Sequence, residues 1–198
     1  MDNRTSKRIV IINGKGKSGK DTFVDMCKDY VNTENYSSID LIKKVAKQLG
    51  YDGGKTMKDR KFLSDMKVLA TEYNDAPYND IINRILKFLY CKDNKNNLLF
   101  LHVREPKEIQ RLLEFGKENN LEMSTLLIVR DLLKKETYGN MADDNVDNFI
   151  YDYYVFNNGT KEDLYGEMLE YLSDFHKFPI FGWENENIFK REYTPIWK

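Results

Sequence analysis

The chain has 198 residues, of which 41% are hydrophobic and 32% are charged, and its formal net charge is −1. This composition is typical of a one-domain globular protein and excludes a disordered or fibrous chain. The near-neutral charge provides no basic field for a nucleic-acid backbone, so we expect no nucleic-acid partner.

Two cysteines, Cys27 and Cys91, lie far apart in the sequence, which argues against a disulfide framework or a zinc site. The N-terminal region is polar, and its apolar run is too short for a signal peptide or a membrane span. We therefore expect a cytoplasmic protein without a membrane partner. The sequence does not distinguish a monomer from a homodimer.

The first predicted element is a buried parallel strand over residues 9–13, because this run is short, apolar and β-branched. Residues 14–22 follow it and read Gly-Lys-Gly-Lys-Ser-Gly-Lys-Asp-Thr. A helix comes next, with Phe23, Cys27 and Tyr30 on one face. A glycine-rich turn between a strand and a helix is the setting of the Walker A phosphate-binding loop.

The loop has the residues that phosphate binding requires. Gly14, Gly16 and Gly19 let the backbone curl, so that successive N–H groups point at phosphate oxygens, and the helix N-terminus adds free N–H groups. Lys20 is expected to reach the β- and γ-phosphates, and to be solvated when no nucleotide is bound. The alternative is a loop that only reverses the chain. The expected nucleotide contacts are Gly14, Lys15, Gly16, Lys17, Ser18, Gly19, Lys20, Asp21 and Thr22.

The motif departs from the usual pattern after its lysine. Asp21 stands where a Ser or Thr normally holds Mg²⁺, and Thr22 follows it. A carboxylate beside a triphosphate is unfavourable unless it faces the metal, a cation or solvent. Thr22 is therefore the predicted magnesium ligand, with Asp21 as a second candidate. Alternatively, Asp21 only interacts with the helix dipole.

Between the loop and residue 91 the pattern predicts one strand and three helices. The strand covers residues 36–39, and the helices cover residues 41–49, a segment that begins after Thr56, and residues 77–90. Thr56 and Asp59 have the spacing of a capping box. We expect the buried face of the helix after Thr56 to be an apolar stripe made of Phe62, Met66, Leu69 and Tyr73.

From residue 98 on, strands and helices continue to alternate. The strands cover residues 98–103, 124–129 and 153–156, one helix begins at Pro106, and a last one begins after Thr160 and carries Leu164, Met168, Leu172 and Phe175. This order predicts an α/β protein with the three-layer P-loop NTPase fold, a mostly parallel five-stranded sheet with helices on both faces.

Polar residues follow the predicted strands. Ligands of such sheets bind beyond the carboxyl ends of the strands. The residues at these ends are Asp40, Arg104 with Glu105, Arg130 with Asp131, and Asn157 with Asn158 and Gly159. Arginine suits the place, because its planar fork binds phosphate oxygens in pairs. His102 and His176 are assigned no function.

Several blocks, in this order, resemble the phage-type deoxynucleoside monophosphate kinases over residues 7–176. The blocks are Gly19-Lys20-Asp21-Thr22, Ser38-Ile39-Asp40 with Lys43-Lys44, residues 59–63, residues 103–108 and residues 158–164. The resemblance implies that Arg104 clamps the acceptor phosphate, that Asp40 lies near the acceptor nucleotide, and that a lid follows the fourth strand.

The resemblance also implies a division of the chain. Residues 1–176 form the kinase domain, with acceptor-binding helices at residues 50–91 and a lid at residues 132–148; the aromatic tail, residues 177–198, packs on the domain or on a second subunit. The expected catalytic residues are Lys20, Arg104, Arg130 and Asp40. The expected acceptor-binding residues are Asp40, Lys43, Arg60 and Arg104. Asn158 and Gly159 are expected to contribute to the nucleotide site.

The implied activity is transfer of the γ-phosphoryl group of ATP, bound with Mg²⁺, to a (deoxy)nucleoside monophosphate. Alternatives are a P-loop kinase for another small phosphorylated acceptor, a binding module without turnover, and an ATPase. An ATPase needs a carboxylate pair after an apolar strand, whereas residues 98–103 are followed by Arg104 and Glu105. Asp40 is alternatively a helix cap, and Arg60 alternatively forms a solvent-facing ion pair.

Overall fold

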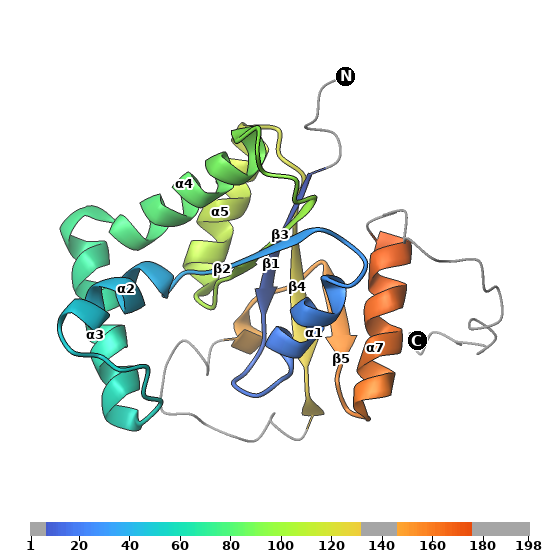
Figure 1. The fold of residues 1–198 in the computed structure, drawn as a ribbon, viewed down its shortest axis with the longest axis horizontal. Helices are drawn as coiled ribbons and strands as arrows, with labels where there is room; N and C mark the ends of the chain where they lie inside the picture. Colours follow the sequence, from blue (N-terminus) through green and yellow to red (C-terminus); the bar gives the residue numbers. More distant parts are fainter. Residues whose placement is uncertain (1–6, 132–145, 176–198) are drawn as a thin grey trace.

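The computed structural model describes residues 7–131 and 146–175. Its centre is one parallel sheet with the strand order β2-β3-β1-β4-β5 (Figure 1). The strands are β1 (Arg8–Asn13), β2 (Thr33–Ser37), β3 (Leu98–His102), β4 (Met123–Val129) and β5 (Tyr153–Phe156). The predicted α/β fold with a parallel five-stranded sheet is confirmed.

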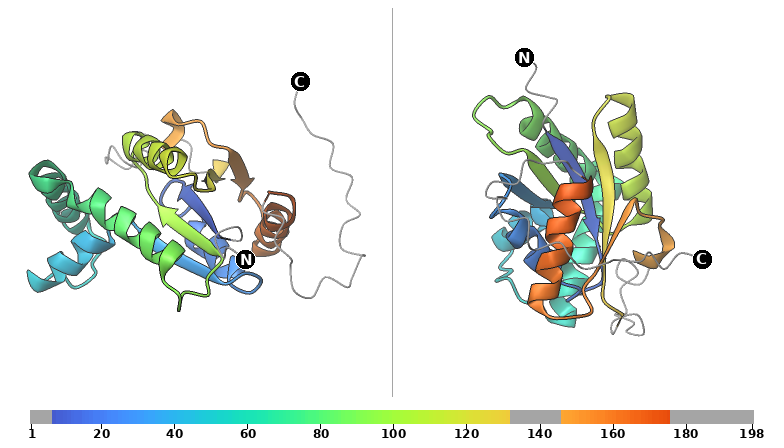
Figure 2. Two further views of the ribbon diagram at one scale, coloured as in Figure 1. Left: turned by 90° about the horizontal axis from the view of Figure 1, so that it is seen from above. Right: turned by 90° about the vertical axis from the view of Figure 1, so that its right-hand side faces the viewer.

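The helices lie on both faces of the sheet (Figure 2). They are α1 (Lys20–Cys27), α2 (Asp40–Gln48), α3 (Met57–Asn74), α4 (Ala76–Tyr90), α5 (Pro106–Glu118) and α7 (Lys161–Glu170). A short 3₁₀ helix, η3 (Val146–Asn148), precedes β5, and a π-helical turn, η4 (Tyr171–Phe175), continues α7. Among the described residues no helix has the length and apolar character needed to cross a membrane.

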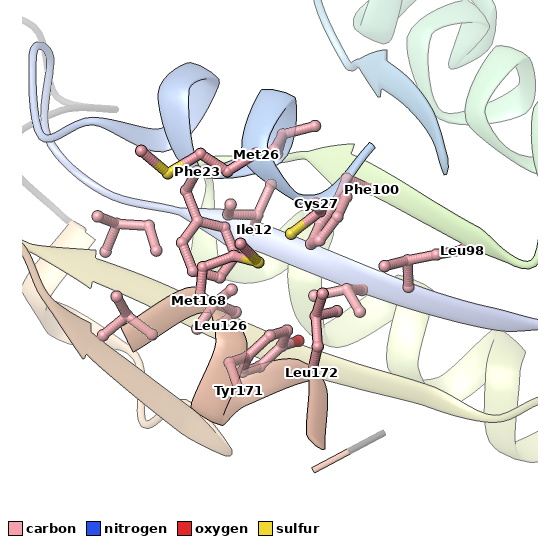
Figure 3. Packing of buried hydrophobic residues seen from close by; sticks show 14 of the residues in the cluster. Ile12, Phe23, Met26, Cys27, Leu98, Phe100, Leu126, Met168, Tyr171 and Leu172 are labelled. Atoms are coloured by element: carbon pink, nitrogen blue, oxygen red, sulfur yellow. The ribbon is translucent and has the colours of Figure 1, made fainter. Parts of the chain in front are cut away.

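Successive side chains of the central strands point to opposite faces of the sheet and belong to two separate cores. Val10 and Ile12 of β1 belong to one core with Phe23 of α1 and Met168 of α7. Figure 3 shows Ile12, Phe23 and Met168 in this core. Ile9 and Ile11 face the other way. The second core joins them to α4 and α5 through Ile81, Ile85, Phe88, Ile109 and Leu112. Because both faces of β1 are covered, its sequence is a continuous apolar run.

Helices α2 and α3 extend beyond the sheet on the β2 side (Figures 1 and 2). Together with α4, which also packs on the sheet, they are called here the helical arm, residues 40–90. A small third core inside the arm consists of Ile42 and Ala46 from α2 and Leu63 from α3. The capping box of Thr56 and Asp59 is present at the start of α3, as predicted.

The predicted buried face of α3 is wrong. Leu69 and Tyr73 are 66% and 86% exposed, whereas Leu63 and Lys67 are buried. The helix is therefore rotated: Leu69 and Tyr73 of the predicted stripe face outward, Met66 remains partly buried against the third core, and Lys67 points into the protein. The reason is a charged interaction with α5, described below, that lies far away in the sequence.

Two further expectations need correction. The second strand covers Thr33–Ser37 rather than residues 36–39, because its ladder with β3 begins at Thr33 opposite Leu98. Asp40 is the first residue of α2 and not its cap; Ile39 precedes the helix without a side-chain hydrogen bond. The lid expected at residues 132–148 and the tail at residues 177–198 lie almost entirely outside the described residues.

Candidate active site

The loop between β1 and α1 has the tight backbone that the motif requires. Gly14 and Gly19 have φ angles of 147° and 101°, which a side chain rarely allows, and Lys17 adopts a left-handed φ of 65°. A Cβ atom at Gly19 would lie 2.3 Å from Nδ2 of Asn157. The loop is thus closed against the carboxyl end of β5.

Asn157 is the residue that braces the loop from β5. Its Nδ2 donates to the carbonyl of Ser18 at 2.8 Å, and its own N–H donates to Val129 of β4 at 2.7 Å. Sequence reasoning singled out Asn158 instead, whose side chain is hydrogen-bonded to Asp131. The period of two from buried Val155 would have identified Asn157 as the residue on the α1 face.

Lys20 is buried and lies inside the loop. Its Nζ donates to the carbonyls of Gly14 and Lys15 at 2.5 and 3.0 Å. The expectation that this lysine is solvated without nucleotide is therefore wrong, since the loop carbonyls take the place of solvent. The ammonium group already lies where a phosphate chain in the loop would meet it.

The start of α1 is suited to an anion. Among the described residues no side chain caps this helix, so N–H groups of its first turn are available to phosphate oxygens. Asp21 and Thr22 are exposed there. The described residues contain no cluster of three or more metal-ligating side chains.

A cavity of about 450 Å³ opens beside the loop, toward the ends of β4 and β5. Arg130 and Lys17 provide positive charge to it, and Leu164 provides an apolar surface. Its lining consists of Lys17, Ser18, Gly19, Lys20, Asp21, Thr22, Arg130, Asn157, Gly159, Thr160, Lys161 and Leu164. A cavity with basic groups next to a phosphate loop is suited to the rest of a nucleotide.

Asp40 and Arg104 lie on the other side of β1, after β2 and β3. The carboxylate of Asp40 accepts a hydrogen bond from the N–H of Ser37 at 2.9 Å, and Nζ of Lys43 is 3.5 Å from it. Arg60 is exposed in the first turn of α3. The structure thus brings Asp40 and Lys43 together.

Asn13 connects the two sides of the site. This buried residue accepts a hydrogen bond from the N–H of Gly14 at 2.8 Å, and its Nδ2 donates to the carbonyl of Arg104 at 3.2 Å. Nδ2 also donates to the hydroxyl of Tyr151, which in turn donates to Val146. The backbone that carries Arg104 is therefore fixed relative to the phosphate loop.

A buried charge cluster joins α3 of the arm to the start of α5, directly after Arg104 in the chain. Lys67 of α3 contacts Glu105 at 2.8 Å and Glu108 at 2.9 Å, and its Nζ lies 3.4 Å from Oγ of Ser38. Burial and the charge of Glu105 raise the pKa of Glu108 to about 7, although Lys67 opposes this. Burial also acts upward on the pKa of Glu105, but the charge and hydrogen bond of Lys67, together with hydrogen bonds from Glu108 and the backbone, leave that pKa below its ordinary value.

His102 ends β3 at this edge of the sheet. Burial lowers the pKa of its imidazole to about 4, so the ring is uncharged at neutral pH. Sequence reasoning gave this residue no function, because a single histidine inside a strand is usually structural.

Sequence comparisons give no relative: no family model matches the chain, and no curated protein is significantly similar to it. Solved structures do resemble it. The tunicamycin resistance protein of Deinococcus radiodurans is 10% identical, with a TM-score of 0.50 over 83% of this chain and 95% of that one. This likeness shows the fold alone.

Two other structures are similar at lower scores. A sugar kinase from a Janibacter species is 12% identical, with a TM-score of 0.46 over 87% of this chain and 97% of its own. The APS kinase of Mycobacterium tuberculosis, in complex with AMPPNP and APS, is 12% identical, with a TM-score of 0.39 over 85% of this chain and 98% of its own.

Proposed function

We propose that this chain transfers the γ-phosphoryl group of ATP to a nucleoside monophosphate, deoxynucleotides included. The observation that carries the proposal is the arrangement around the phosphate loop. A basic cavity lies on the β4–β5 side of the loop, and Asp40 and Arg104 follow the strands on its β2–β3 side. A donor and an acceptor can therefore approach one loop from opposite sides, as direct phosphoryl transfer requires.

On the donor side, the loop and the start of α1 bind the phosphates, and Lys20 follows the transferred group. Arg130 and Lys17 cover the phosphates from the side of the cavity. Asn158 and Gly159, which follow β5, also belong to the nucleotide site. Thr22, with Asp21 beside it, holds Mg²⁺ together with water. The metal ion neutralises charge that develops on the β- and γ-oxygens.

On the acceptor side, Arg104 clamps the monophosphate, and Asp40, Lys43 and Arg60 bind the remainder of the nucleotide. The attacking phosphate oxygen is already ionised at neutral pH, so the reaction needs positioning and charge neutralisation rather than a strong base. Asn13 supports this geometry, since it fixes the backbone of Arg104 to the loop.

The same proposal gives the other parts of the chain their functions. Residues 50–91 include the acceptor-binding helices, and residues 132–148 form a lid over ATP. Residues 177–198 pack on the domain or on a second subunit. The protein acts in the cytoplasm, and its binding partners are its small nucleotide substrates.

The test is a panel of ribo- and deoxyribonucleoside monophosphates and small phosphorylated metabolites, each incubated with ATP and Mg²⁺. We expect one or a few of the nucleoside monophosphates to be phosphorylated. For each of them, one ADP should form from ATP for every acceptor molecule phosphorylated. Transfer only to a non-nucleotide would replace the acceptor in the proposal. ADP release that does not depend on any acceptor would identify an ATPase and contradict it.

A further inference from the structure

His102 lies at a point of the sheet where the two sides of the site meet. It is opposite Ile12 of β1 and Ser37 of β2, and its carbonyl accepts a hydrogen bond from the N–H of Ser38 at 3.0 Å. Side chains alternate along a strand, so His102 shares the α1 face of the sheet with Leu98 and Phe100. The imidazole is thus directed to the layer that contains the phosphate loop.

The ring has an unused hydrogen-bonding atom. Nε2 of His102 is buried and has no hydrogen-bond partner among residues 7–131 and 146–175. A buried polar atom without a partner is costly, and in native structures it usually marks a site for water, an ion or a ligand. A neutral imidazole can donate one hydrogen bond and accept another.

The charged groups around the ring belong to both halves of the site. Asp21 and Lys20 come from the phosphate loop and α1, whereas Asp40 and Arg104 come from the ends of β2 and β3. The donor cavity is on the far side of β1, toward β4 and β5, so its lining does not include His102. Nε2 thus belongs to the β2–β3 side of the site, where Asp40 and Arg104 follow their strands.

We infer that Nε2 of His102 donates a hydrogen bond to the phosphate of the bound acceptor, an inference that rests on the proposed function. An uncharged donor at this position aligns the attacking group between Arg104 and Lys20 without adding a further cation. His102 is then a substrate-contacting residue that sequence reasoning had left without a function.

Three substitutions test the contact. His102→Leu retains bulk but removes the nitrogen, His102→Gln places an amide nitrogen near the position of Nε2, and His102→Asn places one nearer Nδ1. With the best monophosphate of the panel, we expect His102→Leu to lower kcat/KM for the acceptor by about 10- to 100-fold, the range for a lost hydrogen bond to a charged group. His102→Gln should recover most of this loss and His102→Asn little of it, while AMPPNP affinity measured without acceptor stays constant.

Nuclear magnetic resonance gives a readout independent of turnover. The chain has two histidines, so a His176→Gln variant leaves the imidazole signals of His102 alone in the ¹⁵N spectrum. We expect the Nε2 signal to move when the same monophosphate is added without ATP. Movement with Mg²⁺–AMPPNP but not with the monophosphate would place Nε2 on the donor and overturn the inference.

Wild-type acceptor kinetics in His102→Leu would also overturn it and leave His102 as a packing residue. Failure of the proposed function looks different, because wild-type protein would then show no acceptor-dependent turnover with any monophosphate. In that case the contact with an acceptor phosphate is refuted as well.

Discussion

Lys20 donates hydrogen bonds to the carbonyls of Gly14 and Lys15, so its ammonium group occupies the loop before a nucleotide enters. A bound phosphate chain has to take over this cation from the two carbonyls. The energy of that exchange is small for binding, since hydrogen bonds are replaced by others of similar strength. The larger effect is expected on the chemical step, where charge on the transferred group changes.

Replacing Lys20 with alanine should therefore reduce turnover much more than nucleotide affinity. We expect a loss of about 10²–10³ in kcat, as for other preorganised electrostatic groups. Lys28→Ala is the matched control, because Lys28 is an exposed lysine just beyond α1 that pairs with Asp25. Steady-state kinetics and thermal unfolding of both variants provide the measurement. A folded Lys20→Ala protein with near-normal kcat would refute the donor site.

Arg104 can be separated from the donor site by a conservative change. Lysine carries the same charge but lacks the fork that binds two phosphate oxygens, so Arg104→Lys should raise the acceptor KM or lower kcat. Affinity for AMPPNP without acceptor should remain unchanged. Arg111→Lys is the control, since Arg111 forms an exposed ion pair with Asp75 and lies over the ring of Tyr78. Equal loss of AMPPNP affinity in Arg104→Lys would place this arginine on the triphosphate.

At the scale of the elements, α3 has two apolar faces that differ in what they contact. Leu63 packs with Ile42 and Ala46 of α2, whereas Leu69 on the same helix is 66% exposed. The small core of the arm is separate from the two cores of the sheet. A change in it should therefore affect the arm first.

The two leucines allow a matched comparison. Leu63→Ala should lower the free energy of unfolding by about 2 kcal/mol, the lower end for a buried leucine, because the arm core is small and can partly collapse. Leu69→Ala should change it by less than about 0.5 kcal/mol, as most surface substitutions do. Chemical denaturation measures both. Similar losses in the two variants, or a larger loss for Leu69→Ala, would contradict the observed rotation of α3.

The orientation of α3 is also where prediction from sequence failed. Local patterns predicted the loop after β1, the apolar strand β3, the capping box at Thr56 and the start of the last helix after Thr160, because adjacent residues determine these features. The buried face of α3 depends on Lys67, which has the sequence character of a surface residue. Its partners Glu105 and Glu108 follow β3, so no window around α3 contains them.

The candidate site was predicted to a similar extent. The loop and the residues after each strand were identified, because parallel strands bring their carboxyl ends to one edge. Asn157 was noted after the fifth strand but not assigned to the site, and Asn13 was missed, because their contacts depend on strand phase and on hydrogen bonds between distant segments. Strand β2 was misplaced because its side chains are only half-buried and its pairing with β3 determines its limits.

At the scale of the whole molecule, Lys67, Glu105 and Glu108 form a buried cluster that links α3 of the helical arm to the start of α5. Glu108 holds its proton more tightly in the folded chain than in the unfolded one, because its pKa rises from an ordinary 4.5 to about 7. Its contribution to stability is therefore complete below the unfolded pKa and is lost as the pH rises toward about 7.

Glu108→Gln should remove this dependence, since glutamine resembles the protonated acid at every pH. We expect the unfolding free energy of the wild type, relative to Glu108→Gln, to fall between about pH 5 and pH 7 and then to level off. Denaturation series at several pH values measure the difference. Glu118→Gln, at an exposed position of α5, is the control and should give a flat difference. A difference that rises with pH would refute the raised pKa of Glu108.

The strand order has a consequence for how the chain acquires its structure. β1 and β2 do not touch each other, and both pair with β3, which begins at Leu98. A fragment that ends before Leu98 thus holds two strands with no ladder between them, and the apolar strand β1 lacks both of its partners, β3 and β4. Folding has to wait for contacts of long sequence separation, which slows it and exposes β1 to aggregation. Cutting the chain within the arm should give two pieces that fold only when they are mixed.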